Sequence, residues 1–208
     1  MNYFRFHRWV SWFSKYLIWD YPAEKGKVFL TFDDGPHPDI TPWVLEVLRQ
    51  KSIKATFFCV GANIEKYPKL FDQLKNEGHL IGNHTFNHEM GWEEQTRSYV
   101  ASVDACEKLV GNKLFRPPYG RISLAQIRQL KRRYQIVMWS LLSRDYSVRK
   151  DPKKLLQSLT KKVRSGDVVV FHDSLKAQKN LRVMLPQFID AVHSKGLQFE
   201  LIKLKRQI

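Results

Sequence analysis

Short apolar runs alternate with longer amphipathic stretches from Pro22 to the end of the chain. Each apolar run has the length of a strand buried inside a sheet, and each is followed by a stretch long enough for a helix. We therefore expect about seven strands, over residues 28–32, 55–60, 80–82, 113–115, 136–139, 168–171 and 199–202.

The stretches between these runs have the apolar spacing of helices. The first has Pro42 in its first turn, where a helix tolerates proline, and carries Val44, Leu45, Val47 and Leu48 as apolar positions. We expect helices over 41–50, 64–76, 93–109, 123–133, 152–164 and 181–194, several of which end near a glycine.

Repeated alternation of strands and helices predicts an α/β fold with a parallel sheet. The sheet can close into a barrel or stay open as a doubly wound layer, and the spacing alone does not choose between them. Both topologies gather functional residues in the loops that follow the carboxyl ends of strands. Polar motifs at those positions therefore indicate the site.

One domain accounts for the chain of 208 residues, 43% of them hydrophobic. We expect it over 23–208, preceded by an amphipathic helical segment, 1–22, that packs on it; contact with a membrane surface is the alternative for this segment. Arg5, Arg8 and Lys15 interrupt its apolar positions, so no signal peptide or membrane span is recognised. We expect a cytoplasmic or peripheral membrane location rather than secretion.

The chain is strongly basic, with 35 Lys and Arg against 20 Asp and Glu and a net charge of +15. This balance favours acidic partners and allows weak contact with a membrane surface or a polyanion. Because no nucleic-acid motif accompanies the charge, we expect no nucleic-acid partner. Cys59 and Cys106 lie in apolar runs, and we interpret them as buried thiols, with a bridge as the alternative.

Two adjacent carboxylates, Asp33 and Asp34, follow the first expected strand and precede Gly35 and Pro36. Adjacent strand residues point to opposite sides, but a turn here can bring both acids to one pocket, one as ligand and one as base. Asp-Gly and Gly-Pro are also ordinary turn sequences. The pair alone therefore leaves function and turn chemistry equally open.

Two histidines four residues apart, His84 and His88, follow the third expected strand. One helical turn would place them on one face, a suitable spacing for two ligands of one ion. With Asp34 they would supply one carboxylate and two imidazoles and leave coordination positions for water and substrate. Thr85 stands where a metalloprotease motif needs glutamate, so the base must come from elsewhere, and we expect Asp33.

Two further motifs also follow expected strands. Consecutive prolines stiffen the segment 116–120, so Arg116 could hold a site carboxylate, and the amide of Tyr119 could bind developing oxyanion charge. Without the other motifs, a proline turn with a surface arginine would be the preferred interpretation. His172 ends the sixth expected strand and suits proton donation to a leaving amine.

Together, the segments 31–36, 84–88, 116–120 and 170–173 resemble four of the five motifs of NodB-type polysaccharide deacetylases, carbohydrate esterase family 4. The resemblance implies a distorted (β/α) barrel of about seven parallel strands. It implies hydrolysis of the acetamido group of N-acetylhexosamine glycans of the chitooligosaccharide or peptidoglycan type, and a divalent ion, usually zinc, with Co²⁺ or Ni²⁺ as alternatives. By similarity, Asp33 would be the catalytic base and His172 the general acid, and Asp34, His84 and His88 would bind the metal. Arg116 would orient the base, and the amide of Tyr119 would stabilise the oxyanion.

The fifth motif departs from the family pattern, which has two aspartates three residues apart ahead of an aromatic residue. Here Leu142 takes the first acidic position, and Asp145 remains, followed by Tyr146. We expect Asp145 to belong to the catalytic group, although its role toward His172 or Arg116 is left open. Pro118, Tyr119, Tyr146 and Phe171 are the residues that we expect to contact the sugar, and Trp139 suits either the groove or the core.

Other functions are weighed on the same residues. In a haloacid dehalogenase-type phosphatase the two carboxylates lie two residues apart, whereas Asp33 adjoins Asp34. A non-haem iron oxygenase shares the ligand set but normally has a β-sandwich-like scaffold. An inactive protein that binds a glycan or an anionic surface on the same fold, and a deacetylase of a small intracellular N-acetyl sugar conjugate, remain alternatives.

Overall fold

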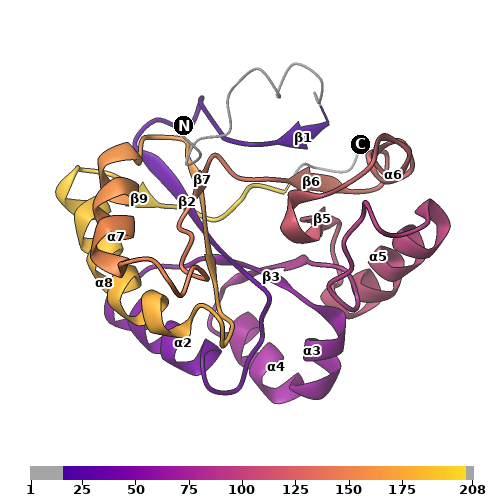
Figure 1. Cartoon of the computed structure of the whole chain (residues 1–208), viewed down its shortest axis with the longest axis horizontal. Helices are drawn as coiled ribbons and strands as arrows, with labels where there is room; N and C mark the ends of the chain where they lie inside the picture. Colours follow the sequence, from indigo (N-terminus) through magenta and orange to yellow (C-terminus); the bar gives the residue numbers. More distant parts are fainter. Residues whose placement is uncertain (1–15, 205–208) are drawn as a thin grey trace.

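The computed structural model describes residues 16–204 and arranges them around a curved parallel sheet (Figure 1). In these residues the strand order is β1-β6-β5-β4-β3-β2-β8-β7, and β9 pairs with β2. The strands are β1 (Leu17–Ile18), β2 (Lys27–Asp33), β3 (Thr56–Cys59), β4 (Leu80–Asn83), β5 (Leu114–Phe115), β6 (Gln135–Val137), β7 (Leu141–Leu142), β8 (Val168–His172) and β9 (Gln198–Phe199).

The helices connect these strands and cover the outside of the sheet (Figure 1). Their bounds are α2 (Thr41–Gln50), α3 (Gly61–Lys66), α4 (Pro68–Asn76), α5 (Thr96–Val110), η1 (Pro118–Gly120), α6 (Leu124–Leu130), α7 (Pro152–Lys162) and α8 (Gln178–Ser194). None of the helices within 16–204 is long and apolar enough to cross a membrane.

The segment from Gln135 to Leu142 joins the two sides of the curved sheet. β6 pairs with β5 on one side, and three residues later β7 pairs with β8 on the other. All strand pairs between the named strands are parallel. This arrangement confirms the expected distorted (β/α) barrel.

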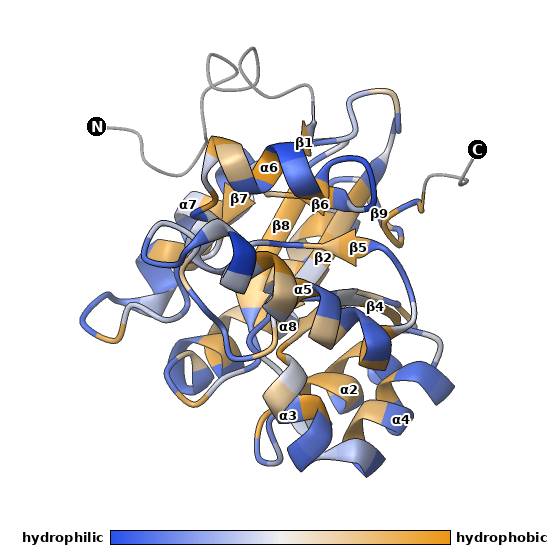
Figure 2. Ribbon diagram, turned by 90° about the vertical axis from the view of Figure 1, so that its right-hand side faces the viewer, coloured by the Kyte–Doolittle hydropathy of each residue, from blue (hydrophilic) through white to orange (hydrophobic). Residues whose placement is uncertain are grey.

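Side chains of the central strands alternate between two apolar layers, as the period of a strand requires. Val28, Leu30 and Phe32 of β2 pack outward under the helices, whereas Phe29 packs inside the barrel. Because both faces are covered, β2 and β8 are largely apolar (Figure 2). Asp33 ends β2 on the inner side, in phase with Phe29, and so reaches the interior end of the barrel.

Several expectations from the sequence need correction. The segment 64–76 is two helices rather than one, because Pro68 cannot continue α3 and instead begins α4. β1 and β7 were not expected, since two residues are too few to display a period. Residues 17–18 are a strand paired with β6 and not part of a helix; residues 1–15 of the N-terminal segment lie outside the described residues. Both cysteines are buried free thiols, as expected.

Candidate active site

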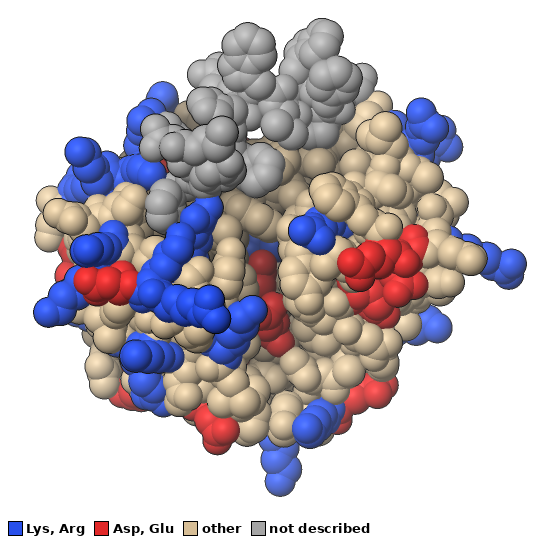
Figure 3. All heavy atoms as spheres, viewed as in Figure 1, with Lys and Arg blue, Asp and Glu red and all other residues tan. Residues whose placement is uncertain are grey.

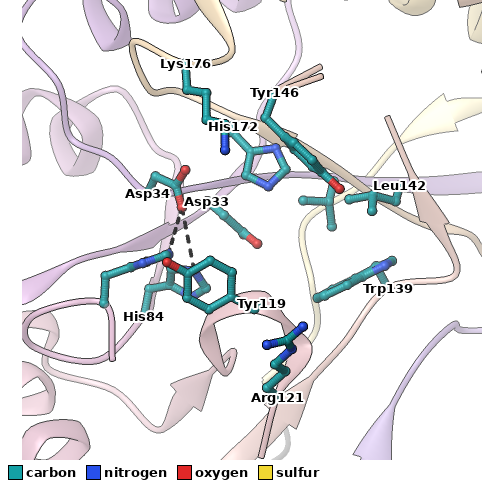
Figure 4. Close-up of a pocket in the computed structure, with 12 residues that line it drawn as sticks. Asp33, Asp34, His84, Tyr119, Arg121, Trp139, Leu142, Tyr146, His172 and Lys176 are labelled. Atoms are coloured by element: carbon teal, nitrogen blue, oxygen red, sulfur yellow. Dashed lines mark ion pairs between the residues drawn. The ribbon is translucent and has the colours of Figure 1, made fainter. Parts of the chain in front are cut away.

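A pocket of about 380 Å³ opens at the carboxyl ends of the strands (Figure 4). The polar groups expected from four separate motifs meet there, because parallel strands end at the same edge of the barrel. Its lining residues are Asp33, Asp34, His84, His88, Tyr119, Arg121, Trp139, Leu142, Tyr146, Val170, His172 and Lys176.

The turn after β2 separates the two adjacent carboxylates. Asp34 has φ of +81°, a left-handed conformation that brings its side chain back toward the pocket. Asn63 donates to the carbonyl of Asp34 at 2.8 Å, and the amide of Gly35 donates to Asp173 at 3.1 Å. These bonds fix the turn, so Asp33 and Asp34 line one pocket as predicted.

His84 and His88 come together through a loop, not through a helical turn. Thr85 and His88 both have φ above +60°, and no residue from 84 to 88 is helical. The side chain of Asn83, the last residue of β4, accepts from the amide of Thr85 at 2.8 Å and stabilises the turn. The helical explanation of the spacing is therefore wrong, although the two imidazoles do lie side by side, with ring centres 5.1 Å apart.

Asp34, His84 and His88 form a group with the geometry of a metal site. One ligand atom from each lies within 4.8 Å of the others, and Oδ1 of Asp34 is 3.1 Å from Nε2 of His88. Nδ1 of His84 lies 2.8 Å from the carbonyl of Arg116, which can only accept, so Nδ1 carries the proton and Nε2 is free to bind an ion. These three residues fit a divalent cation.

The charge states of this group also suit a cation. Burial lowers the pKa of His84 to about 4, so its imidazole is neutral at neutral pH. Burial alone would raise the pKa of Asp34, but its hydrogen bond to His88 and the charge of His172 hold it well below the usual range. A neutral imidazole and an ionised carboxylate are the forms in which these side chains bind metals.

Arg116 is fully buried and holds Asp33. Its Nη1 donates to Oδ1 of Asp33 at 2.6 Å and to Thr31 at 2.7 Å. Its remaining nitrogens donate to the carbonyls of Val137 and Met138, at 3.2 and 2.9 Å. With all these partners in place, the guanidinium has one fixed position and the carboxylate of Asp33 is oriented toward the pocket (Figure 4).

Asp145 pairs with His172, which answers the question left by the altered fifth motif. Nδ1 of His172 is 2.7 Å from Oδ1 of Asp145, and the amide of His172 donates to Oδ2 at 2.8 Å. Burial lowers the pKa of His172, but the charge and hydrogen bond of Asp145 outweigh it and raise that pKa to about 9. Leu142 lines the pocket, and neither His172 nor Arg116 depends on an acid at that position.

The residues expected to contact the sugar divide into two sets. Tyr119, with 57% of its surface exposed, and Tyr146 line the pocket, and so does Trp139. Phe171 does not, because strand alternation turns it away from His172 into the outer core, where it is fully buried. Pro118 is buried and absent from the lining. The prediction that the side chains of Phe171 and Pro118 contact the sugar is therefore wrong.

Supporting residues of the site were missed in the sequence. Asp173 accepts from Gly35 and, at 2.5 Å, from Thr41, and so anchors the turn of Asp34. Glu89 accepts from Asn87, in the loop of His88, and from Ser102 of α5. No spacing rule reveals such contacts, because their partners come from other elements; the cations Arg121 and Lys176 in the pocket wall were missed for the same reason.

The fold and the site together fit a hydrolase that uses a divalent metal. The family model described as "Polysaccharide deacetylase" matches residues 20–139, more than half of the chain. The chain therefore belongs to the polysaccharide deacetylase family, and the resemblance to NodB-type carbohydrate esterases of family 4 is confirmed.

Similar proteins include two peptidoglycan-N-acetylglucosamine deacetylases of Bacillus cereus. One is 34% identical over 202 residues, 91% of this chain and 94% of that protein. The other is longer: it is 38% identical over 144 residues, 65% of this chain but only 52% of that protein. The crystal structure of the Bc1960 peptidoglycan N-acetylglucosamine deacetylase, bound to a naphthalenyl N-hydroxybenzamide, superposes with a TM-score of 0.86 at 29% identity, covering 94% of both chains.

Proposed function

We propose that the chain removes the N-acetyl group from N-acetylglucosamine units of a peptidoglycan-type glycan, with zinc held by Asp34, His84 and His88. One observation carries this proposal. Asp33 and His172 are register partners at the ends of neighbouring strands, and both face the pocket that the metal ligands line. A base and an acid on two sides of one ion are what amide hydrolysis requires.

A divalent ion held by the three residues would act as a Lewis acid on the acetamido carbonyl. Zinc is the proposed metal because two imidazoles and one carboxylate, with coordination positions left open, form an established type of zinc site. Cobalt and nickel also accept such ligands, so they serve as comparison metals.

Asp33 is placed to accept the proton of the attacking water. Its Oδ1 accepts from Nη1 of Arg116, and this bond prevents the carboxylate from turning to the metal group. Its side chain is almost completely buried, so the water that it orients is shielded from bulk solvent. Asp34, the neighbouring acid, takes the ligand role because its turn conformation brings it to His88.

His172 is placed to donate a proton to the leaving amine. Because Asp145 raises the pKa of His172 to about 9, the imidazole carries its second proton at neutral pH. Its Nδ1 is occupied by Asp145, so Nε2 is the atom that delivers the proton. The amide of Tyr119, on the opposite wall, is proposed to stabilise the developing oxyanion.

The proposed substrate follows from the relatives, both of which are named for peptidoglycan. Aromatic side chains in the wall, Tyr119, Tyr146 and Trp139, offer faces on which sugar rings can pack. A small N-acetyl sugar conjugate and a neutral chitooligosaccharide are the competing substrates for the same chemistry.

The test measures acetate release by the purified full chain, before and after removal of metal with a chelator. We expect hydrolysis of peptidoglycan fragments, its loss in the metal-free protein, and its return with zinc or cobalt. Full hydrolysis without metal would refute the metal role. Binding of the fragments without acetate release from them, from chitotetraose or from small N-acetyl conjugates would favour an inactive binding protein instead.

A further inference from the structure

The segment 143–182, which forms one side of the pocket, is strongly basic. It contains eleven Lys and Arg against four Asp and Glu. Asp145, Asp167 and Asp173 are buried, and Asp151 caps the first turn of α7. The solvent-facing charge of this segment is therefore almost entirely positive.

The opposite side of the pocket has the reverse balance. Residues 61–112, which include α3, α4 and α5, contain eight Asp and Glu against five Lys and Arg. Figure 3 shows this division on one face: Lys and Arg gather over α7 and α8 on the left of a central hollow, and Asp and Glu form a patch on its right. Residues 143–182 therefore carry a net charge of +7, and residues 61–112 a net charge of −3.

Positive charge also reaches the pocket itself. Lys176 lines the pocket, with its Nζ 5.7 Å from the centre of the Tyr146 ring. Burial raises the pKa of Tyr146, and the nearby charge of Arg144 opposes the rise. Burial lowers the pKa of Lys162, and the charges of Arg144 and Lys161 add to the decrease. We call this group of cations the basic ridge; its members are Arg144, Lys161, Lys162 and Lys176.

The carboxylates of the site do not neutralise Lys176. Asp33 is already paired with the buried guanidinium of Arg116. Within residues 16–204, no carboxylate forms an ion pair with Lys176. A divalent ion at Asp34 would add further positive charge, and the cations beside the pocket favour anionic groups on an approaching molecule.

We propose that the basic ridge binds carboxylate or phosphate groups carried by the glycan, so that the preferred substrate is an anionic rather than a neutral N-acetylated polymer. This inference rests on the proposed deacetylation. Tyr146 and Lys176 line the same pocket as Asp33 and His172, so a sugar with its acetamido group between the last two would lie beside them. Substituents on neighbouring sugars then meet the ridge.

The first experiment compares acetate release from three matched substrates: peptidoglycan disaccharide-peptides, the same fragments after amidation of their carboxyl groups, and neutral chitotetraose. At about 0.05 M salt we expect kcat/KM to be at least about tenfold higher for the anionic fragments, and the preference to shrink at about 0.5 M salt because exposed charges are then screened. A chitotetraose bearing a reducing-end phosphate tells whether phosphate serves as well as carboxylate. Equal kcat/KM for neutral and charged substrates, at both salt concentrations, would overturn the proposal.

The second experiment reverses the ridge charges with Lys162→Glu/Lys176→Glu. The ratio of anionic to neutral kcat/KM should fall by about tenfold, the scale of two exposed charge pairs changed from attraction to repulsion, and the loss should appear in KM. The control Lys69→Glu/Lys108→Glu makes the same change of net charge on exposed residues of α4 and α5. It should leave the ratio unchanged. An equal fall in the control would mean that net charge alone, and no ridge, sets the preference.

Binding measurements separate this inference from the proposed function. If no substrate releases acetate but anionic fragments bind with a Kd that weakens in salt and in the ridge variant, deacetylation fails and the ridge stands. If acetate is released without any charge preference, deacetylation stands and the ridge fails. Tight binding of the ridge to phosphatidylglycerol vesicles, with no preference among glycans, would assign the ridge to a membrane and overturn the proposal.

Discussion

Both oxygens of the Asp145 carboxylate bind His172, one through Nδ1 at 2.7 Å and the other through the backbone amide at 2.8 Å. The ring therefore cannot rotate without losing a bond, and its Nε2 has one direction. The carboxylate also raises the pKa of His172 to about 9, which keeps a proton available for transfer. Asp145 therefore sets both the orientation and the protonation of His172.

Asp145→Asn should shift the alkaline limit of activity to lower pH. The proton donor is the charged form of His172, which is present below its pKa of about 9 and is lost as the pH rises through that value. Removal of the Asp145 charge removes the main cause of the raised pKa, so the decrease of kcat should begin at lower pH. The pH profile of kcat measures the shift.

Asp151→Asn is the matched control for that profile, because it removes the same charge from the exposed cap of α7 and asparagine still caps a helix. Its profile should follow that of the unmodified chain. An unchanged alkaline limit in Asp145→Asn would mean that Asp145 orients His172 but does not set its protonation.

Asp33→Asn should abolish turnover while the metal stays bound. The amide keeps the size of the side chain but cannot take a proton from water, a loss on the order of 10² to 10⁴ in kcat. Metal content, measured on the purified protein, should stay near about one ion per chain because the ligands are untouched. Asp39→Asn, an exposed change in the same loop, should alter neither quantity.

Loss of the Asp33 charge also leaves Arg116 buried without its ion pair, which costs about 3–5 kcal/mol when one partner is removed. Urea unfolding of the variant is therefore needed beside the kinetics. A folded, metal-loaded Asp33→Asn with full activity would rule out Asp33 as the base.

The sequence identified the site because four of its functional groups stand at the end of an apolar run or directly after it. Asp33 ends β2 and His172 ends β8, while His84 and Arg116 come one residue after β4 and β5. In a parallel sheet those positions converge whatever the strand order, so the cluster was predictable even though the choice between an open sheet and a barrel was not.

The remaining features depend on contacts that have no local pattern. The left-handed conformation of His88 was unforeseen, because histidine adopts it only where surrounding bonds require it. β7 is two residues long and exists because β8 offers an edge for pairing. The apolar run of β8 gave no sign of which side Phe171 faces, since strands buried on both faces are apolar throughout.

Glu89→Ala should weaken metal binding without touching a ligand. The Glu89 carboxylate accepts from the amide and side chain of Asn87 and from Ser102, so it holds the loop that carries His88. Loss of a group that supports a metal ligand typically lowers affinity by about 10- to 100-fold. Competition with a chelator of known affinity measures the change.

Glu93→Ala serves as the control, because Glu93 is exposed two residues past the same loop and its described contact is through the backbone. It should keep the original affinity. If Glu89→Ala also keeps it, the loop is held by its backbone turns alone, and the proposed support by Glu89 is wrong.

Gly35→Ala should destabilise the fold and disturb the metal site together. A Cβ at this position would lie 2.1 Å from Oδ2 of Asp173, and that carboxylate cannot move freely because it accepts from Thr41 and from the amide of Gly35. Overpacking of this kind costs about 1–3 kcal/mol, and relief of the clash would displace the turn of Asp34.

Gly196→Ala meets open space at φ of +69° and should cost only the left-handed strain, about 1–2 kcal/mol, with no effect on metal affinity. Urea unfolding of the metal-free variants measures their stability, and competition with a chelator measures their metal affinity. Normal metal affinity in Gly35→Ala would show that the turn of Asp34 forms without the support of Asp173.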